Sequence, residues 1–229
     1  MALSAIGRNQ LNTGIDDNSD ATAVTISSGE LVGIGETSPT SALHVKGGAG
    51  TNLAIQSTAG THWRIGDGVG STNGNLVIYD YTDSRKVFEI DTLGRVTTPN
   101  QPAFRAVLIT STNTVNNYMI FESVDYNIGN HYNATTGIFT APISGRYMVS
   151  VQGFNENNQN SQLYVRVNNA NKTYSLSYAG ASGSNQYNMM SHHTVFNLAA
   201  NDTVRVFCAA GELYASSADS NSFSCYLLG

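Results

Sequence analysis

The chain has 229 residues, 12% of them charged, and a net charge of −5. This charge excludes the basic surface that binds nucleic acid and the polybasic patch that binds anionic lipid. No segment approaches the roughly 20 apolar residues of a membrane span, so we expect no membrane insertion. Asn, Ser, Thr and Gly supply most of the polarity, and these residues favour strands and turns over helices, which predicts an all-β fold.

Residues 1–30 form a polar segment with an acidic cluster at Asp16, Asp17 and Asp20. Its only strand candidate is the run ATAVTI at residues 21–26. Such a segment buries little surface alone, so we expect it to be ordered only by a partner. The start MALSAIGRNQ has no long apolar stretch, so we expect no secretory signal and synthesis in a cytosol.

Residues 31–100 contain short strand-like pieces separated by glycines, such as LVGIG, NLVIYDY and KVFEIDT. Their side chains offer little volume for a core within one chain, so we expect several chains to share a core as an intertwined β-rich shaft. The sequence PNQP, Pro99 to Pro102, marks the end of this region, because proline cannot continue a strand ladder.

Residues 101–229 hold longer strand candidates with regular turn signals, which is typical of an all-β sandwich. The segment TTGIFTAPISGRYMVSV, residues 135–151, predicts a strand, a reversal and a second strand. Phe139 and Tyr147 are its expected packing anchors, and Pro142 and Gly145 are expected to set a hairpin-like reversal. Most of the aromatic residues of the chain lie in this half, which therefore should hold the sizeable core.

Three blocks of this half, NIGNHYNATTGIFTAPISGRYMVSV, LAANDTVRVF and NSFSCYLL, resemble the globular head of complement component 1q. The resemblance implies a jelly roll of the tumour-necrosis-factor superfamily and a threefold homotrimer. Asn201 and Cys225 stand where that family usually has Gly. The matching residues expected in the fold-signature core are Tyr132, Phe139, Pro142, Gly145, Tyr147, Phe223 and Leu227.

The first half resembles the tail-fibre and virion structural proteins of bacteriophages. The resemblance rests on LVGIGETSPTSALHV, on the blocks that follow it up to GRVTT, and on the opening MALSAIGRNQ. It implies that residues 1–30 dock to another virion protein, that residues 31–100 form the shaft, and that residues 101–229 form a knob at its end.

The sequence predicts no catalytic residues, no cofactor and no enzyme activity, because it lacks a nucleophile elbow, an HExxH motif and a phosphate-binding loop. His192 and His193 are adjacent on one expected strand, so they should point to opposite faces and cannot form a two-ligand metal pair. The carboxylates form no cluster of the kind that supplies the 6–8 oxygens of a calcium site. We therefore predict no metal, with calcium binding by the knob left open.

Cys208 and Cys225 share the alternation of their apolar neighbours. This favours two buried core thiols. A disulfide between them is the alternative, and sequence spacing alone cannot place their Cα atoms within bonding range.

The stretch from residue 153 to residue 193 is dense in Asn, Gln, Ser and Tyr, the residue types that dominate antibody combining sites. A solvated surface of a polar jelly roll is the alternative. The candidate receptor-binding residues are Asn155, Tyr174, Tyr178, Gln186 and Tyr187.

These observations predict a bacteriophage virion fibre protein, a homotrimer whose knob binds a host cell-surface receptor, either a glycan or an outer-membrane protein. Three weak sites on one stalk would give avidity through effective concentration. The first alternative is a capsid decoration or head fibre protein with a structural role. A second is a soluble bacterial or animal complement-like lectin, which the absence of an expected signal segment disfavours. The expected location is the virion, after synthesis in a host cytoplasm.

Overall fold

The computed structural model describes residues 24–48, 50–70, 74–110, 115–155, 160–177, 188–211, 213 and 220–229, without the side chains of residues 174–177 and 188. The chain divides into two compact units, Met1–Pro99 and Asn100–Gly229. The described residues of both units contain strands and turns without helices, as the all-β prediction required. Over this part of the chain no helix is long and apolar enough to cross a membrane.

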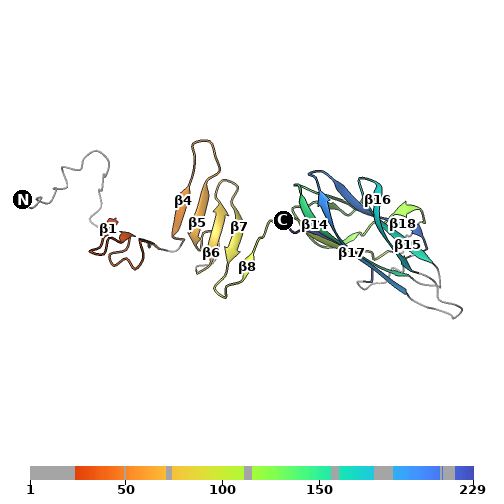
Figure 1. Ribbon diagram of the computed structural model, residues 1–229, viewed down its shortest axis with the longest axis horizontal. Helices are drawn as coiled ribbons and strands as arrows, with labels where there is room; N and C mark the ends of the chain where they lie inside the picture. Colours follow the sequence, from red (N-terminus) through yellow and green to blue (C-terminus); the bar gives the residue numbers. More distant parts are fainter. Residues whose placement is uncertain are drawn as a thin grey trace, which may run out of the picture. The chain divides into compact units, whose positions relative to one another are not determined.

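The described part of the first unit contains a three-stranded and a five-stranded sheet. In the small sheet β1 and β2 are antiparallel, whereas β2 and β3 are parallel. In the larger sheet each strand pairs with the next, so that β4 to β8 form an antiparallel meander (Figure 1). The strands are β1 Val24–Ile26, β2 Val32–Ile34, β3 Leu43–Val45, β4 Asn52–Ile55, β5 Trp63–Asp67, β6 Leu76–Asp80, β7 Arg85–Ile90 and β8 Val96–Thr97.

One face of the β4–β8 sheet carries large apolar side chains. The strand register places Leu53, Ile65 and Ile78 in one row across the sheet, which Phe88 of β7 completes. Ile55 and Trp63 form a neighbouring pair on the same face. The opposite face buries Val77 completely. Leu53 keeps 55% of its surface exposed in the single chain, so this row of side chains is only partly covered.

The second unit is a sandwich of two antiparallel sheets with the jelly-roll architecture. One sheet has the order β12-β13-β18-β15-β16, with β10 also paired to β18, and the other has the order β11-β9-β19-β14-β17. The strands are β9 Ala103–Val107, β10 Asn117–Tyr118, β11 Ser123–Ile128, β12 Tyr132–Asn133, β13 Ile138–Thr140, β14 Gly145–Asn155, β15 Ser161–Val167, β16 Ala170–Ser177, β17 Asn188–Leu198, β18 Thr203–Ala210 and β19 Ser222–Leu227.

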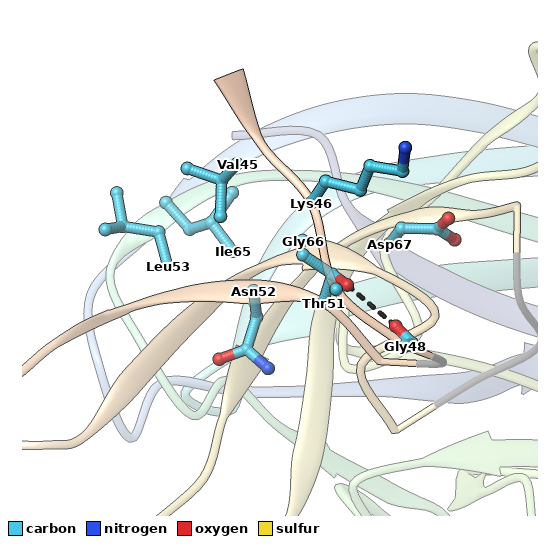
Figure 2. A pocket seen from close by; sticks show the side chains of 10 residues that line it. Val45, Lys46, Gly48, Thr51, Asn52, Leu53, Ile65, Gly66 and Asp67 are labelled. Carbon is cyan, nitrogen blue, oxygen red and sulfur yellow. Dashed lines mark hydrogen bonds between the residues drawn. The ribbon is translucent and has the colours of Figure 1, made fainter. Parts of the chain in front are cut away.

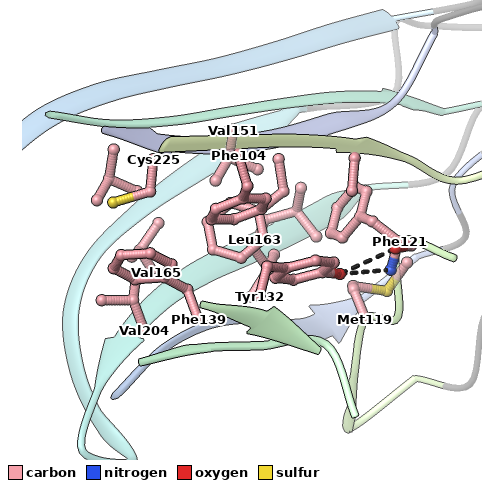
Figure 3. Close-up of a cluster of buried hydrophobic side chains, with 14 of the residues drawn as sticks. Phe104, Met119, Phe121, Tyr132, Phe139, Val151, Leu163, Val165, Val204 and Cys225 are labelled. Atoms are coloured by element: carbon pink, nitrogen blue, oxygen red, sulfur yellow. Dashed lines mark hydrogen bonds between the residues drawn. The ribbon is translucent and has the colours of Figure 1, made fainter. Parts of the chain in front are cut away.

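An aromatic cluster fills the space between the two sheets (Figure 3). Phe104 of β9 lies at its centre, with ring centroids 5.3 Å from Phe139 and 4.9 Å from Phe223. The Tyr132 hydroxyl donates to the carbonyl oxygen of Phe121 at 2.9 Å and accepts from the Phe121 amide at 3.2 Å. Tyr132 thus brings its polar group into the core without leaving it unpaired, as a buried hydroxyl requires.

The segment from β13 to β14 has the predicted anchors but is not a hairpin. Phe139 and Tyr147 are both completely buried. However, β13 pairs with β18 and β14 pairs with β17 and β19, so the turn through Pro142 carries the chain from one sheet to the other. Both strands alternate apolar and polar residues, and each buries its apolar side in the same core from opposite layers.

Two residues near this crossover adopt the left-handed backbone region. Gly137 has φ of 69° and a Cβ there would lie 2.4 Å from the carbonyl oxygen of Met119, so only glycine fits. Asn201 has φ of 70°, a conformation that Asn tolerates better than most residues. This explains why Asn201 can replace the family's usual Gly.

The first and last strands of the sandwich are neighbours. β9 and β19 pair in antiparallel register. The Leu227 amide donates to the Pro102 carbonyl oxygen at 3.0 Å, and the Arg146 amide donates to the Gly229 carbonyl oxygen at 2.9 Å. The residues that begin and end the unit are therefore held together by backbone hydrogen bonds.

Candidate functional site

The outward face of the sheet β11-β9-β19-β14-β17 carries an apolar row that crosses all five strands. The register aligns Ile128, Ala103, Tyr226, Met148 and Val195 in this order. Val195 is 49% exposed and Tyr226 42%. A continuous exposed apolar band on a sheet is typical of an interaction surface. We call these five residues the apolar row.

A polar row lies beside the apolar row on the same face. It contains Tyr126, Arg105, Ser224, Ser150 and His193. Arg105 forms an ion pair with Asp125 of β11. Ser150 Oγ lies 2.9 Å from His193 Nδ1. This face therefore combines apolar contact area with side chains that can make directional hydrogen bonds.

The outward face of the other sheet holds arginines against aromatic rings. Arg166 of β15 and Arg205 of β18 are direct cross-strand partners. Arg166 Cζ lies 3.5 Å from the ring centroid of Phe207, and Arg205 Cζ lies 3.2 Å from that of Tyr118. The alternation of β15 already indicates that Arg166 faces outward, but its register with Arg205 depends on strands far apart in the sequence.

His192 and His193 point to opposite faces of β17, as predicted. His193 is exposed, whereas His192 is half-buried with Nε2 2.6 Å from Thr173 Oγ1. Burial lowers the pKa of His192, and the neighbouring His193 lowers it further. The two imidazoles cannot share one ligand.

The predicted contact residues do not form one described site. Asn155 is buried, and its Nδ2 donates to Ser161 Oγ at 3.0 Å, so this side chain lies inside the unit rather than on its surface. Tyr174 lies on β16 opposite Tyr164. The side chain of Tyr174 and all of Tyr178, Gln186 and Tyr187 lie outside the described residues, so their binding role stays a prediction.

The described residues contain no group of three His, Cys, Asp or Glu side chains that could hold a metal ion. Cys208 and Cys225 are buried and unbonded to each other, which confirms the prediction of two core thiols. Burial raises the pKa of the Cys225 thiol. A thiol of this kind is a poor nucleophile, because the reactive form is the thiolate.

The first unit has an open hollow of about 350 Å³ beside β4 and β5 (Figure 2). Leu53 and Ile65 line one side, and Lys46 and Asp67 line the other. Lys46 Nζ forms an ion pair with Glu36 at 2.7 Å, so its charge is already compensated. The hollow is continuous with the apolar face of the β4–β8 sheet through Leu53 and Ile65.

Comparison with known protein families assigns the two-sheet sandwich of the second unit to a family. Residues 103–228 match the family described as "C1q domain". The chain belongs to the C1q domain family. This confirms the resemblance found in the second half of the sequence. The match begins at residue 103, so it gives no support to the resemblance of residues 31–100 to phage fibre shafts.

Two curated relatives share this region with the chain. Complement C1q tumor necrosis factor-related protein 3 of mouse and the human protein of the same name are each 30% identical to it over 128 residues. The alignment covers 56% of this chain and 51% of each relative. The chain thus spans about half the length of the curated relatives it matches.

These relatives correct the functional prediction. They are mouse and human proteins named for complement C1q and tumour necrosis factor. The prediction of a bacteriophage fibre protein is therefore wrong. The capsid-fibre alternative and the virion location are wrong for the same reason. The segment LVGIGETSPTSALHV and the blocks that follow it suggested a phage fibre. These pieces are short and bounded by glycines, and short glycine-bounded strands occur wherever sheets turn tightly.

Two solved structures resemble part of the chain. The globular domain of zebrafish complement 1qA is 17% identical, with a TM-score of 0.46, and covers 56% of this chain and 98% of its own. Eiger TNF from S. frugiperda is 14% identical, with a TM-score of 0.48, and covers 57% of this chain and 94% of its own.

Proposed function

We propose that the chain is a non-catalytic binding protein that assembles as a homotrimer through its C1q domain. Membership of this family supports the assembly, because C1q and tumour-necrosis-factor domains form homotrimers. Three copies on one particle would present three equal surfaces to a ligand, so that weak single contacts add up through effective concentration.

The apolar row carries the proposal. Ile128, Tyr226 and Val195 are exposed in the single chain although they lie in line on one sheet face. Burying this row between copies would remove its apolar surface from water at about 25 cal/mol per Å². The adjoining polar row, with Ser150 and His193, would then supply the hydrogen bonds that fix the register of the contact.

The first unit supports assembly in a second way. The apolar face of the β4–β8 sheet includes Leu53, Ile55 and Trp63, and Leu53 and Ile55 are about half exposed. In a C1q-domain trimer the three sheets would be tethered to one assembly, because each is covalently joined to its domain through residues 99–102. We propose that the three copies pack these faces into a common core. This keeps the shared core expected for residues 31–100 and drops its assignment to a virion.

The test is the mass of the full chain by sedimentation or light scattering, with Val195→Glu as the disrupting variant. A carboxylate buried in this interface without a partner costs several kcal/mol, so we expect a trimer for the natural chain and a lower mass for the variant. Ile143→Glu is the matched control, because Ile143 is 52% exposed in the β13–β14 turn and lies outside the row. A monomeric natural chain at micromolar concentration would contradict the proposal, and so would a Val195→Glu trimer.

A further inference from the structure

The arginine pair on the outward face of β15 and β18 has no carboxylate counter-ion in the described part of the chain. Arg166 and Arg205 are direct partners across the strands, and like charges placed opposite each other destabilise a sheet. Among the described residues neither forms an ion pair with a carboxylate. The nearby Asp202 is already hydrogen-bonded to Asn168 Nδ2 at 2.7 Å and to the Ala199 amide at 2.9 Å.

Both guanidinium groups are held in place by neutral groups. Arg166 Nε donates to Asn171 Oδ1 at 2.6 Å, its Nη1 donates to the Tyr118 hydroxyl at 3.3 Å, and its guanidinium stacks on Phe207. Arg205 Nη2 donates to the Thr136 carbonyl oxygen at 3.1 Å, and its guanidinium stacks on Tyr118. Stacking of this kind stabilises a cation by about 0.5–1 kcal/mol at exposed sites, which does not neutralise it. The two charges are thus fixed in position, and no described carboxylate neutralises them.

Unused donors remain on the pair. Arg205 Nε is buried and has no hydrogen-bond partner among the described residues. Burial lowers the pKa of Arg205, the Tyr118 hydroxyl raises it, and Arg166 lowers it. Because Arg205 Nε is buried, an external acceptor would reach the outer nitrogens instead. Neither Arg166 Nη2 nor Arg205 Nη1 makes a hydrogen bond to a described residue.

The surroundings of the pair suit a sugar. The Tyr118 hydroxyl of β10 donates to Asn169 Oδ1 at 3.0 Å and accepts from Arg166. On β15, the strand of Arg166, Gln162 Nε2 donates to the Tyr164 hydroxyl at 2.8 Å. Amide and hydroxyl groups of this kind exchange hydrogen bonds with sugar hydroxyls, while a guanidinium fork matches the oxygens of a carboxylate or sulfate.

We propose that Arg166 and Arg205 form an oxyanion site that binds the sulfate or carboxylate group of an acidic saccharide. The site lies on the sheet opposite the apolar row, so it stays open in the assembly proposed above and does not depend on it. Three copies would present three such sites, but each site is complete within one chain.

The test is calorimetric titration of the full chain in physiological salt with three tetrasaccharides: a sulfated one prepared from heparin, an oligogalacturonate and neutral maltotetraose. We expect binding of at least one acidic saccharide and none of maltotetraose. The heparin tetrasaccharide carries sulfate and carboxylate groups, whereas the oligogalacturonate carries carboxylates without sulfates. Binding of the heparin fragment without binding of the oligogalacturonate would therefore show that the site requires sulfate. A tetraglutamate peptide that binds as well as the better saccharide would overturn the choice of a sugar ligand.

Variants then assign the binding to the pair. Arg166→Gln and Arg205→Gln should each weaken binding at least ~10-fold, because each removes a charged donor. Arg205→Lys keeps the charge but loses the fork, so it should also weaken binding while preserving the fold. Lys172→Gln is the matched control, since it removes a cation of the neighbouring strand β16 whose charge acts on Asp202.

The proposal fails if the natural chain binds no acidic saccharide, or if Arg166→Gln binds as tightly as the natural chain. Measurement on Val195→Glu separates the two proposals. A monomeric variant that keeps the single-site affinity would support the oxyanion site and leave the assembly to its own test.

Discussion

Phe104 and Tyr132 stack face to face in the core of the C1q domain, with ring centroids 4.2 Å apart and ring planes inclined by 4°. The two residues come from different sheets, so their contact joins the layers of the sandwich. The stack also holds the Tyr132 hydroxyl against the backbone of Phe121, and burial raises the pKa of this phenol.

Removing that hydroxyl should destabilise the domain. Tyr132→Phe keeps the ring but leaves the buried amide and carbonyl of Phe121 without their partner, at a cost of ~1–3 kcal/mol. Urea unfolding measures the loss. Tyr126→Phe is the matched control, because Tyr126 is 45% exposed and should change stability by less than ~0.5 kcal/mol. Equal stability of the two variants would contradict the structural role of the hydroxyl.

The backbone at residue 201 makes a second prediction. Asn201→Ala should cost ~1 kcal/mol, because an ordinary side chain with positive φ is strained. Asn201→Gly should be neutral within ~0.5 kcal/mol, since glycine adopts this conformation freely. Scanning calorimetry distinguishes the two variants. Ala200→Gly is the control. Glycine gives the unfolded chain more conformational freedom, so this variant should have a lower free energy of unfolding than the natural chain. An Ala variant at residue 201 that melts above the Gly variant would contradict the assignment.

Acid should weaken the turn that contains Asp202. The Asn168 side chain and the Ala199 amide donate to the Asp202 carboxylate and, with Lys172, hold its pKa below the usual 3.8. A carboxyl with a lowered folded pKa stabilises the fold fully above pH 3.8 and loses this contribution as the pH falls through the folded value. Melting temperatures measured from pH 6 to pH 2 should therefore converge for the natural chain and Asp202→Asn. Parallel curves would show that Asp202 is not linked to stability.

The proposed common core of the first unit predicts a change in fluorescence. Trp63 is the only tryptophan of the chain and shares the apolar sheet face with Leu53. Leu53→Glu should place a charge in the shared core, expose Trp63 to water and move its emission to longer wavelength. Ala54→Glu is the control, because the adjacent residue is exposed on the other face of the same strand. Identical spectra for both variants would argue against packing between copies.

The sequence predicted the sandwich well because its signals are local and redundant. Alternating strands, turn residues and the block from Tyr132 to Tyr147 each indicate the same fold, and Phe139, Tyr147 and Phe223 are buried as expected. The sequence predicted the two strands and the turn of the β13–β14 segment but described them as hairpin-like, because strand–turn–strand patterns look the same whether the strands pair or lie in different layers.

The surfaces were harder to predict than the core. The apolar row and the arginine pair each combine residues from strands that are distant in the sequence, such as Ile128 with Val195 or Arg166 with Arg205. Their alignment depends on strand order and register, which local composition does not determine. The Asn- and Tyr-rich stretch was predicted to bind a receptor from its composition alone, yet the structure buries Asn155.

The functional prediction failed for a different reason. The glycine-bounded pieces of residues 31–100 reflect short strands and tight turns, and Gly35 and Gly94 do adopt positive φ there. This geometry describes a small sheet with frequent reversals. It contains no information about the particle or organism in which the sheet occurs.

The backbone bonds between Pro102 and Leu227, and between Arg146 and Gly229, have a practical consequence for engineering. Since both ends of the domain meet at one place, a short linker could join them and new termini could be opened in an exposed turn, such as that at Ile143. Because its ends lie close together, the domain could also be inserted into a surface loop of an unrelated scaffold without separating the two ends of that loop.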